Sequence, residues 1–333
     1  MNKKSVIRRI FFLIAGIMIV PFALEAQQTA QKHVREIDYL LYLPEAYEMD
    51  SAGSWPLLVF LHGSGNTGNN INQVKSNGIP RVIEKGKKFP FIVISPQSQE
   101  EGWNIRDLKN LLMTEIPKYR VDTDRIYLTG LSMGGTGVWD LATAYPEFFA
   151  AILPICGNVR EPALENAFQL RHTAVWCFHG ADDKVIPASV SETMVDAVRE
   201  FNPDARLTVY PHVGHDSWTV TYNTDSVYRW MLAQKRYVNR ETGIDETLLE
   251  EYASYRYSIP GQSEVAHFTV ENGALRLWVG GQKGELIKPA SNNTFFLDAY
   301  SRKYITFERD ATGALSGCIL YEYNNRIFCK KIE

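Results

Sequence analysis

A serine flanked by glycines is the residue of this sequence whose surroundings best suit nucleophilic chemistry. The string Gly-Leu-Ser-Met-Gly-Gly at 130–135 places Ser132 directly after the apolar run 125–129 and directly before a helical pattern. A sharp strand-to-helix turn holds such a serine in a strained conformation, and the flanking glycines keep Cβ atoms out of the turn. The dipole of the following helix favours negative charge there. We predict that Ser132 is a nucleophile; a glycine-rich turn that serves only helix packing is the alternative.

A serine hydroxyl needs a general base, and that base needs an acid to fix its tautomer. These partners are expected after later strands, in the chain order Ser, Asp, His. Two aspartates and two histidines follow late apolar runs in that order: Asp182, Asp183, His212 and His215. The side chains of neighbouring aspartates diverge, so only one reaches the imidazole, and either could instead be a turn or helix-capping carboxylate. Spacing alone gives Asp183 and His215 a modest preference.

Two backbone N–H groups are expected to stabilise the oxyanion of a tetrahedral intermediate. The residue after the nucleophile, Met133, supplies the first. The apolar run 57–61 ends in His-Gly-Ser-Gly at 62–65, a tight glycine-bearing turn at the position of the second donor. The N–H of Ser64 is therefore the candidate for the second donor.

Short apolar runs alternate with amphipathic segments from about residue 35 to 235, which predicts a mostly parallel α/β sheet with helices on both faces. Several runs are apolar throughout, as in strands that are covered on both faces. The predicted strands are 36–42, 57–61, 91–95, 125–129, 149–155, 174–178 and 206–210. The predicted helices carry apolar residues three to four positions apart, and they are 106–118, 133–144, 188–201 and 224–235.

The pattern changes after residue 236. The polar stretch 237–245 is predicted to be a linker, and residues 246–333 a small antiparallel β-barrel or sandwich, because short alternating runs are separated there by turn signals. The predicted strands of this unit are 265–270, 274–279, 294–298, 303–308, 317–323 and 326–332.

The first 26 residues have the pattern of an export signal. A basic start precedes the apolar run 10–20, and Ala-Leu-Glu-Ala at 23–26 offers a small residue for cleavage before Gln27. The run is shorter than the roughly 20 residues of a spanning helix, so a membrane anchor is the less favoured alternative. We expect a periplasmic or secreted protein without a membrane span, with residues 27–236 as its catalytic domain.

Composition narrows the function classes. A net charge of −3, with no basic run after the first few residues, argues against a nucleic-acid partner. Neither a phosphate-cradling G-x-x-x-x-G-K string nor metal-ligand spacing is present, so neither a cofactor nor a metal is expected. The sequence does not indicate the oligomeric state.

Export implies an oxidising compartment, which makes the four cysteines informative. Cys318 and Cys329 lie on two arms of a predicted hairpin that turns near 324–325. A four-residue loop would oppose them and allow a disulfide, whereas a two-residue turn would place them diagonally. Cys156 and Cys177 end apolar runs and are expected to be buried free thiols.

Three stretches resemble a known family: 119–135, F-P-F-I-V-I-S-P-Q at 89–97 and G-H-D-S-W at 214–218. They make residues 35–236 similar to the dienelactone hydrolase, phospholipase/carboxylesterase and feruloyl esterase-like branch of the α/β-hydrolase superfamily. The resemblance implies the α/β-hydrolase fold.

The resemblance also implies roles for three residues: Ser132 as nucleophile, Asp183 as acid and His215 as base. It thereby decides between the neighbouring aspartates and histidines. Dienelactone hydrolases use a Cys nucleophile, so the Ser in this chain indicates an esterase. The oxyanion turn of the family is often richer in glycine than 62–65, which leaves the second donor open.

These patterns predict a serine ester hydrolase with an acyl-enzyme intermediate, acting on small acyl or feruloyl esters of carbohydrates. The short connection between strands 149–155 and 174–178 indicates an open site without a large lid. Trp103 and Trp218 are predicted to present aromatic faces to the substrate, with packing at the rim as the alternative.

Similar proteins are also labelled peptidases related to prolyl oligopeptidase. A serine peptidase of that type ranks lower because the chain has no propeller repeats, and an inactive binding protein ranks third.

The C-terminal unit resembles small lipocalin-like β-domains appended to bacterial serine hydrolases. The string L-E-E-Y-A-S-Y-R-Y at 249–257 carries the resemblance, with Ser254 where that pattern usually has Gly. The unit has no catalytic constellation, so an accessory role as scaffold or in substrate binding is expected. Trp278 and Tyr300 give a faint indication of carbohydrate binding.

Overall fold

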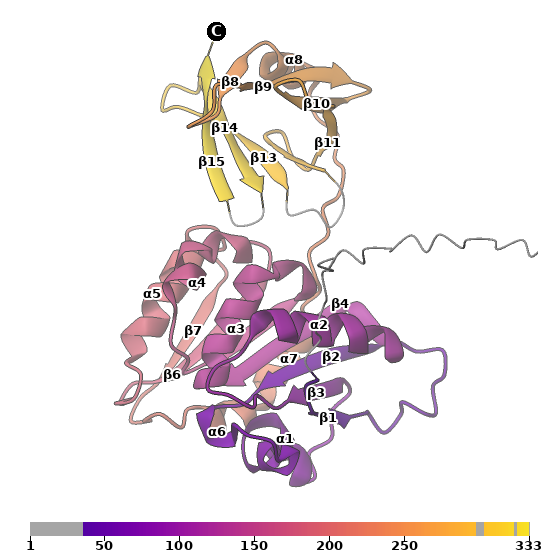
Figure 1. Cartoon of the computed structure of the whole chain (residues 1–333), viewed down its shortest axis with the longest axis vertical. Coiled ribbons are helices and arrows are strands. Elements are labelled where there is room, and N and C mark those ends of the chain that lie inside the picture. The colour runs from indigo at the N-terminus through magenta and orange to yellow at the C-terminus, as the bar shows by residue number, and fades with distance from the viewer. Residues whose placement is uncertain (1–35, 298–302, 323–324, 333) are drawn as a thin grey trace, which may run out of the picture. The chain divides into compact units, whose positions relative to one another are not determined.

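The computed structural model describes residues 36–297, 303–322 and 325–332, so the predicted signal 1–26 and Tyr300 lie outside the described residues. The described residues form a seven-stranded sheet with its helices, followed along the chain by a closed eight-stranded β-barrel (Figure 1). The predicted combination of an α/β unit with a small antiparallel β unit is confirmed.

The sheet has the strand order β1-β3-β2-β4-β5-β6-β7, with β1 antiparallel to β3 and all other neighbours parallel. Strands β3 and β5 are buried along their whole lengths, which explains the continuous apolar runs of the sequence. All seven predicted strands overlap observed ones. Their bounds are β1 (Tyr39–Tyr42), β2 (Trp55–Leu61), β3 (Ile92–Pro96), β4 (Val121–Leu131), β5 (Ala151–Ile155), β6 (Ala174–Gly180) and β7 (Arg206–Tyr210).

Helices cover both faces of the sheet (Figure 1). The apolar sides of α2, α3 and α5 pack into one core, and those of α1 and α7 pack into the other. Among the described residues, every helix is too short or too polar to cross a lipid bilayer. The α-helices of this unit are α1 (Gly78–Glu84), α2 (Ile105–Glu115), α3 (Met133–Ala144), α4 (Glu161–Glu165), α5 (Ala188–Arg199), α6 (Trp218–Tyr222) and α7 (Asp225–Leu232). The 3₁₀ turns are η1 (Ser64–Asn66), η2 (Ile71–Ser76), η3 (Ile116–Lys118), η4 (Pro146–Phe148) and η5 (Ala167–Leu170).

The local sequence of α2 shows why such a helix forms where it does. The side chain of Asn104, at the N-cap, accepts hydrogen bonds from the N–H groups of the second and third helical residues, which have no acceptor inside the helix. Leu108, Leu111 and Leu112 then recur at three- and four-residue spacing and are buried against the sheet. Capping and amphipathic spacing therefore fix both the start and the orientation of the helix.

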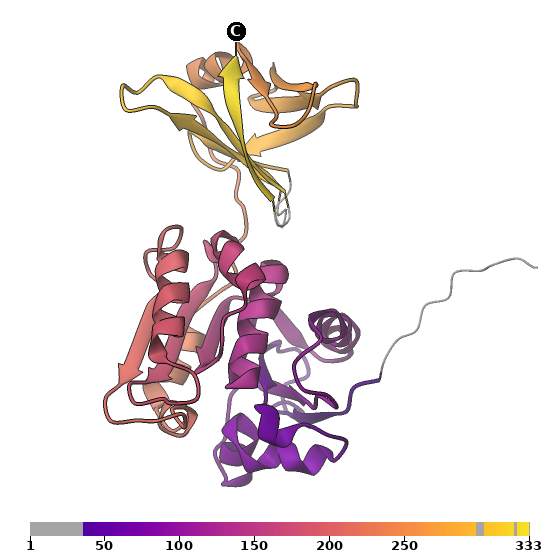
Figure 2. The same cartoon turned by 60° about the vertical axis from the view of Figure 1, so that its left-hand side comes forward.

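The C-terminal unit, drawn in orange and yellow in Figure 2, is a closed antiparallel barrel rather than a sandwich. Its strand order is β10-β11-β12-β13-β14-β15-β8-β9. Helix α8 (Glu246–Ala253) inserts Leu249 and Tyr252 into the barrel core, and the Tyr252 ring stacks on Phe307 with centroids 3.8 Å apart. The strands are β8 (Arg256–Ser258), β9 (Val265–Glu271), β10 (Ala274–Val279), β11 (Glu285–Pro289), β12 (Thr294–Phe296), β13 (Tyr304–Arg309), β14 (Leu315–Glu322) and β15 (Asn325–Ile332).

The register of β14 and β15 decides between the two cysteine arrangements. Cys318 is the direct partner of Cys329, and the last described pair is Glu322 with Asn325. The two cysteines therefore face each other although only two residues, 323–324, separate the last pair. The expectation that a two-residue connection would place them diagonally is wrong, because the connection lies one residue earlier than predicted. Both cysteines are buried free thiols. Cys156 and Cys177 are also buried free thiols, as the sequence predicts.

The junction of β4 and α3 packs against β2 so closely that a side chain has no room there. A Cβ atom built on Gly134 would lie 2.0 Å from the carbonyl oxygen of Leu61, and one on Gly130 would lie 2.5 Å from the carbonyl oxygen of Gly134. Contacts below 3.0 Å with backbone atoms require the strand or the helix to move. The glycines on either side of Ser132 are therefore a steric requirement of the fold.

The close packing at Gly134 predicts a loss of stability when a methyl group is added there. We expect Gly134→Ala to lower the free energy of unfolding by about 3 kcal/mol, because the overpacked backbone must shift. Gly65→Ala is the matched control, since its Cβ atom would have no neighbour within 4 Å. Urea unfolding of the three proteins tests this, and an equal effect of both substitutions would contradict it.

Candidate active site

Ser132 lies at the sharp turn between β4 and α3, in a backbone conformation that residues other than glycine rarely adopt. Its φ is 53° and its ψ is −118°. The N–H of Ser132 donates to the carbonyl of Ile155 at 2.9 Å, and its carbonyl accepts from the N–H of Thr136 at 3.0 Å. Both peptide groups are thus tied to neighbouring elements, which holds the hydroxyl out of the sheet.

Three side chains from three different strand ends form one hydrogen-bonded row. His215 Nε2 lies 2.9 Å from Ser132 Oγ, and His215 Nδ1 lies 2.7 Å from Asp183 Oδ2. Ser132 follows β4, Asp183 follows β6 and His215 follows β7. Because the carboxyl ends of parallel strands meet at one edge of the sheet, residues far apart in sequence come together there.

The competing aspartate and histidine lie outside this row. Asp182 and His212 are exposed, and Oδ2 of Asp182 lies 4.0 Å from Nδ1 of His212. The His212 side chain is 96% exposed, whereas that of His215 is 21% exposed and contacts both partners. The geometry therefore brings together Ser132, His215 and Asp183 and leaves the other two in solvent.

The Asp183 carboxylate is held at both oxygens. Oδ1 accepts from the backbone N–H groups of Val185 and Ile186 at 2.8 and 3.0 Å, while Oδ2 faces His215. Burial alone would raise the pKa of this carboxyl, but the hydrogen bonds from His215, Ile186 and Val185 outweigh it and leave the pKa below its usual value. Asp183 is therefore an anion at neutral pH, as the partner of an imidazole Nδ1–H must be.

The two proposed oxyanion donors both occupy the first position of a helix. Ser64 begins η1, and Met133 begins α3. The N–H of a first helical residue has no acceptor within its own helix, so both groups are available to an outside oxygen. The hydrogen bonds of the η1 turn itself are donated by Asn66 and Thr67 instead.

A buried histidine fixes the turn that carries Ser64. His62 Nδ1 lies 2.7 Å from the carbonyl oxygen of Gly63, and its Nε2 accepts the N–H of Ser98 at 2.9 Å. Burial lowers the pKa of His62, so the ring is neutral with its proton on Nδ1. His62 therefore joins the turn after β2 to the loop after β3.

Of the two tryptophans predicted to contact substrate, Trp103 is buried. Its side chain is 7% exposed, its Nε1–H donates to the His62 carbonyl at 3.3 Å, and its ring fills the space beside Gly137. The prediction of an accessible aromatic face is wrong for Trp103, because the absence of a side chain at Gly137 lets the ring pack onto α3.

Trp218 lies beside the histidine of the row. It begins α6, is partly exposed, and meets the His215 ring edge-on with centroids 5.5 Å apart. Trp139, on α3, is fully buried. Of the three, Trp218 is the tryptophan whose ring reaches the surface next to His215.

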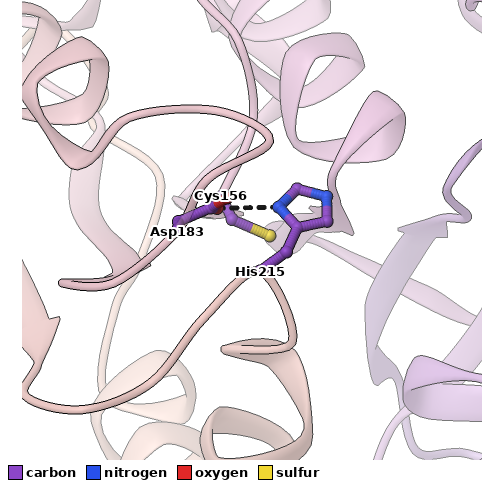
Figure 3. Close-up of side chains that lie close together, drawn as sticks. All are labelled: Cys156, Asp183 and His215. Atoms are coloured by element: carbon purple, nitrogen blue, oxygen red, sulfur yellow. Dashed lines mark hydrogen bonds and ion pairs between the residues drawn. The ribbon is translucent and has the colours of Figure 1, made fainter.

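A buried thiol lies beside the Asp183–His215 pair (Figure 3). One ligand atom from each of Cys156, Asp183 and His215 falls within 4.8 Å of the others, a spacing that could hold a metal ion. These three residues do not suit a metal ion. Asp183 and His215 already hydrogen-bond to each other, and burial raises the pKa of the Cys156 thiol to about 12, so the thiol keeps the proton that a metal ligand must lose. The thiol is therefore a neutral packing group behind the row.

Sequence reasoning gave no role to His62 or to a second buried histidine, His179. His179 lies next to the end of β6 and contacts Asp183 Oδ2 at 3.2 Å. A signal was present, since each of the two histidines directly follows an apolar run and precedes a glycine, at 62–63 and 179–180. A histidine that enters a glycine turn in this way is positioned to bond the turn's own backbone.

Residues 96–237 match the dienelactone hydrolase family, and the match includes Ser132, Asp183 and His215. The resemblance inferred from the sequence is thereby confirmed, together with the α/β-hydrolase fold.

Several proteins are similar over part of the chain. A Yersinia pestis protein provisionally named a carboxymethylenebutenolidase is 31% identical over 166 residues, which are 41% of this chain and 62% of that protein. An Aspergillus clavatus protein provisionally named acetylxylan esterase A is 28% identical over 120 residues, which are 31% of this chain and 39% of that protein. The crystal structure of a thermostable esterase is 28% identical with a TM-score of 0.51, and the alignment covers 60% of each chain. The chain thus spans less than two thirds of each of these proteins.

The low pKa of Asp183 predicts a specific pH dependence of stability. A carboxyl whose pKa is depressed in the folded state stabilises the protein above its ordinary pKa of about 3.9, and this contribution disappears as the pH falls through the folded value. We expect Asp183→Asn to be less stable than the unsubstituted protein at pH 7, with the difference shrinking on acidification because a protonated Asp resembles Asn. Urea unfolding of both proteins across this pH range measures it. A difference that stays constant would contradict the charge assignment.

Proposed function

We propose that this chain is a serine carboxylic ester hydrolase that works through an acyl-enzyme intermediate. The observation that carries the proposal is the row Ser132–His215–Asp183, with contacts of 2.9 and 2.7 Å. A nucleophile, a base within hydrogen-bond reach and an anion that orients the base are the parts this chemistry requires. The family match and the similarity to a thermostable esterase support the same reaction class.

Acylation begins when His215 Nε2 takes the proton of Ser132 Oγ. The oxygen attacks the ester carbonyl carbon, and the resulting oxyanion is held by the N–H groups of Ser64 and Met133 at the starts of η1 and α3. His215 then gives its proton to the alcohol oxygen as the bond between that oxygen and the carbonyl carbon breaks. The alcohol leaves and the acyl group remains on Ser132.

Deacylation repeats these steps with water. His215 takes a proton from the water molecule, the hydroxide attacks the acyl carbon, and the proton passes to Ser132 Oγ as the carboxylic acid departs. Asp183 stays ionised throughout and stabilises the imidazolium that forms in each half-reaction. Its depressed pKa suits this task.

The proposed substrates are small acyl or feruloyl esters of carbohydrates. The similarity to the Aspergillus clavatus protein named for acetylxylan supports a carbohydrate ester. Trp218, partly exposed beside His215, offers an aromatic surface next to the reacting atoms. Between β5 and β6 the chain holds only α4 and η5, which favours an open site.

We also propose the organisation and location that the sequence suggests. Residues 27–236 would act as the catalytic domain and 237–245 as the linker, with 246–333 as an accessory domain. The signal pattern in 1–26 would direct export to the periplasm or the medium.

Substitution of the nucleophile tests the reaction. Using the chain without residues 1–26, we expect Ser132→Ala to lower the turnover of p-nitrophenyl acetate and methyl ferulate by at least about 10³-fold, because the acyl-enzyme cannot form. The ratio of the two rates reports whether aromatic acyl groups are favoured. Turnover that survives in the alanine variant, or cleavage of peptides without any Ser132-dependent ester hydrolysis, would refute the esterase assignment.

A proline tests the oxyanion donor of η1. Ser64→Pro removes one N–H, while the first helical position and the extended backbone of Gly63 both accommodate proline. We expect a loss of about 10²-fold in kcat, as for other single oxyanion donors. Ser64→Ala is the matched control and should retain its rate because it keeps the N–H. Equal rates for the two variants would remove Ser64 from the oxyanion site.

A further inference from the structure

A second histidine touches the carboxylate of the Ser132–His215–Asp183 row. His179 is fully buried in β6, and its Nε2 lies 3.2 Å from Asp183 Oδ2, the same oxygen that faces His215 Nδ1 at 2.7 Å. The same Nε2 lies 2.8 Å from the carbonyl oxygen of Ile186. One carboxylate oxygen thus lies close to two imidazoles, one in β6 and one in the loop after β7.

The hydrogen bonds of His179 place a proton on its Nε2. The Ile186 carbonyl only accepts, so Nε2 must carry the hydrogen that it receives at 2.8 Å, and Asp183 Oδ2 lies 3.2 Å from the same nitrogen. Nδ1 lies 2.7 Å from the Ser191 hydroxyl. Ser191 Oγ accepts from the Cys177 thiol at 3.3 Å, and burial raises the pKa of that thiol to about 12, so it keeps its proton. Every donor in this series meets an acceptor when the Ser191 hydroxyl donates to Nδ1.

His179 and Asp183 together clamp the backbone of Ile186 in the loop after β6, one on each side of the residue. The Ile186 N–H donates to Asp183 Oδ1 at 3.0 Å, while the Ile186 carbonyl accepts from His179. The carboxylate cannot rotate without breaking a bond at each oxygen. Since the rotation of Asp183 sets the direction in which His215 Nδ1–H points, the clamp also sets the direction of His215 Nε2.

We infer that His179 is a positioning residue for the proposed ester hydrolysis, acting through Asp183 by holding the backbone of Ile186, whose N–H donates to Asp183 Oδ1. The inference rests on the proposed function for its kinetic consequence. Its structural content, an Nε2–H of His179 that donates to the Ile186 carbonyl, is independent of any reaction.

The proton position is tested by nitrogen–proton correlation spectra of the protein labelled with ¹⁵N-histidine. These spectra distinguish the two neutral tautomers and the cation. We expect a proton on Nε2 of His179 at pH 7, hydrogen-bonded to the Ile186 carbonyl. An unprotonated Nε2 would overturn the inference even if no ester is hydrolysed.

The kinetic role is tested by a double-mutant cycle with Asp183. We expect His179→Leu to lower kcat/KM about 10- to 100-fold, less than the roughly 10⁴-fold typical of losing the acid, with KM little changed. In an Asp183→Ala background the same substitution should have almost no further effect, because the group through which it acts is gone. Equal losses in the two backgrounds would overturn the positioning role.

Two more variants distinguish a positioning role of His179 from a role in core packing alone. His179→Gln places an amide N–H near the site of Nε2 and should recover most of the lost rate. Val175→Ala, on the same strand and equally buried, should lower the thermal midpoint without a change in kcat/KM. No rescue by Gln, or an equal rate loss in Val175→Ala, would overturn the inference. Absence of Ser132-dependent turnover in the unsubstituted protein would refute the proposed function. The spectra of the ¹⁵N-labelled histidines would then still test the hydrogen bond from His179 Nε2 to the Ile186 carbonyl.

Discussion

The left-handed backbone of Ser132 is the constraint on which the rest of the site depends. A conformation of this kind costs on the order of 1–3 kcal/mol for a residue other than glycine, and it persists only where the surroundings determine it fully. Here the surroundings are the bond to Ile155 on β5 and the side-chain-free approach of Gly134 to Leu61 on β2. The strands next to β4 therefore hold the serine in place, and no flexible loop is involved.

Charge is concentrated at one point of this site. Asp183 is the buried anion of the row, and the Cys156 thiol beside it is uncharged because its pKa is raised. An isolated charge in a poorly solvated site acts strongly on its neighbour, because little water screens it. The Asp183 carboxylate therefore acts strongly on His215, whose Nδ1 lies 2.7 Å from it.

Much of this arrangement could be predicted because it depends on sequence patterns within a few neighbouring residues. Continuous apolar runs identified the strands, and the glycines around Ser132 identified the turn, since both reflect requirements within a few residues. The choice of Asp183 over Asp182 was different: spacing left it nearly open, and the resemblance to a family, not the local chemistry, decided it. The bonds from Val185 and Ile186 that select Asp183 become visible only in three dimensions.

Other features depend on contacts between distant segments and had no local signal. Trp103 is buried because Gly137, on a different element, leaves room for its ring. Helix α1 begins with Gly78 and contains Pro80, so its sequence looks like a loop until its apolar residues are seen against the sheet. Strands β8 and β11 have three and five residues, and the second ends in proline, so neither gives a clear alternating pattern.

The closure of the barrel has a consequence for the order in which the chain can fold. Strand β8, the first of the barrel, is hydrogen-bonded to β15, the last. Neither strand can therefore have both of its neighbours until β15 has been synthesised. During synthesis the sheet β1–β7 is complete well before then, while β8 and β14 still present unpaired backbone edges. Until β15 emerges from the ribosome, the nascent barrel is an open sheet that can pair with other chains, so the α/β unit can reach its final form before the barrel does.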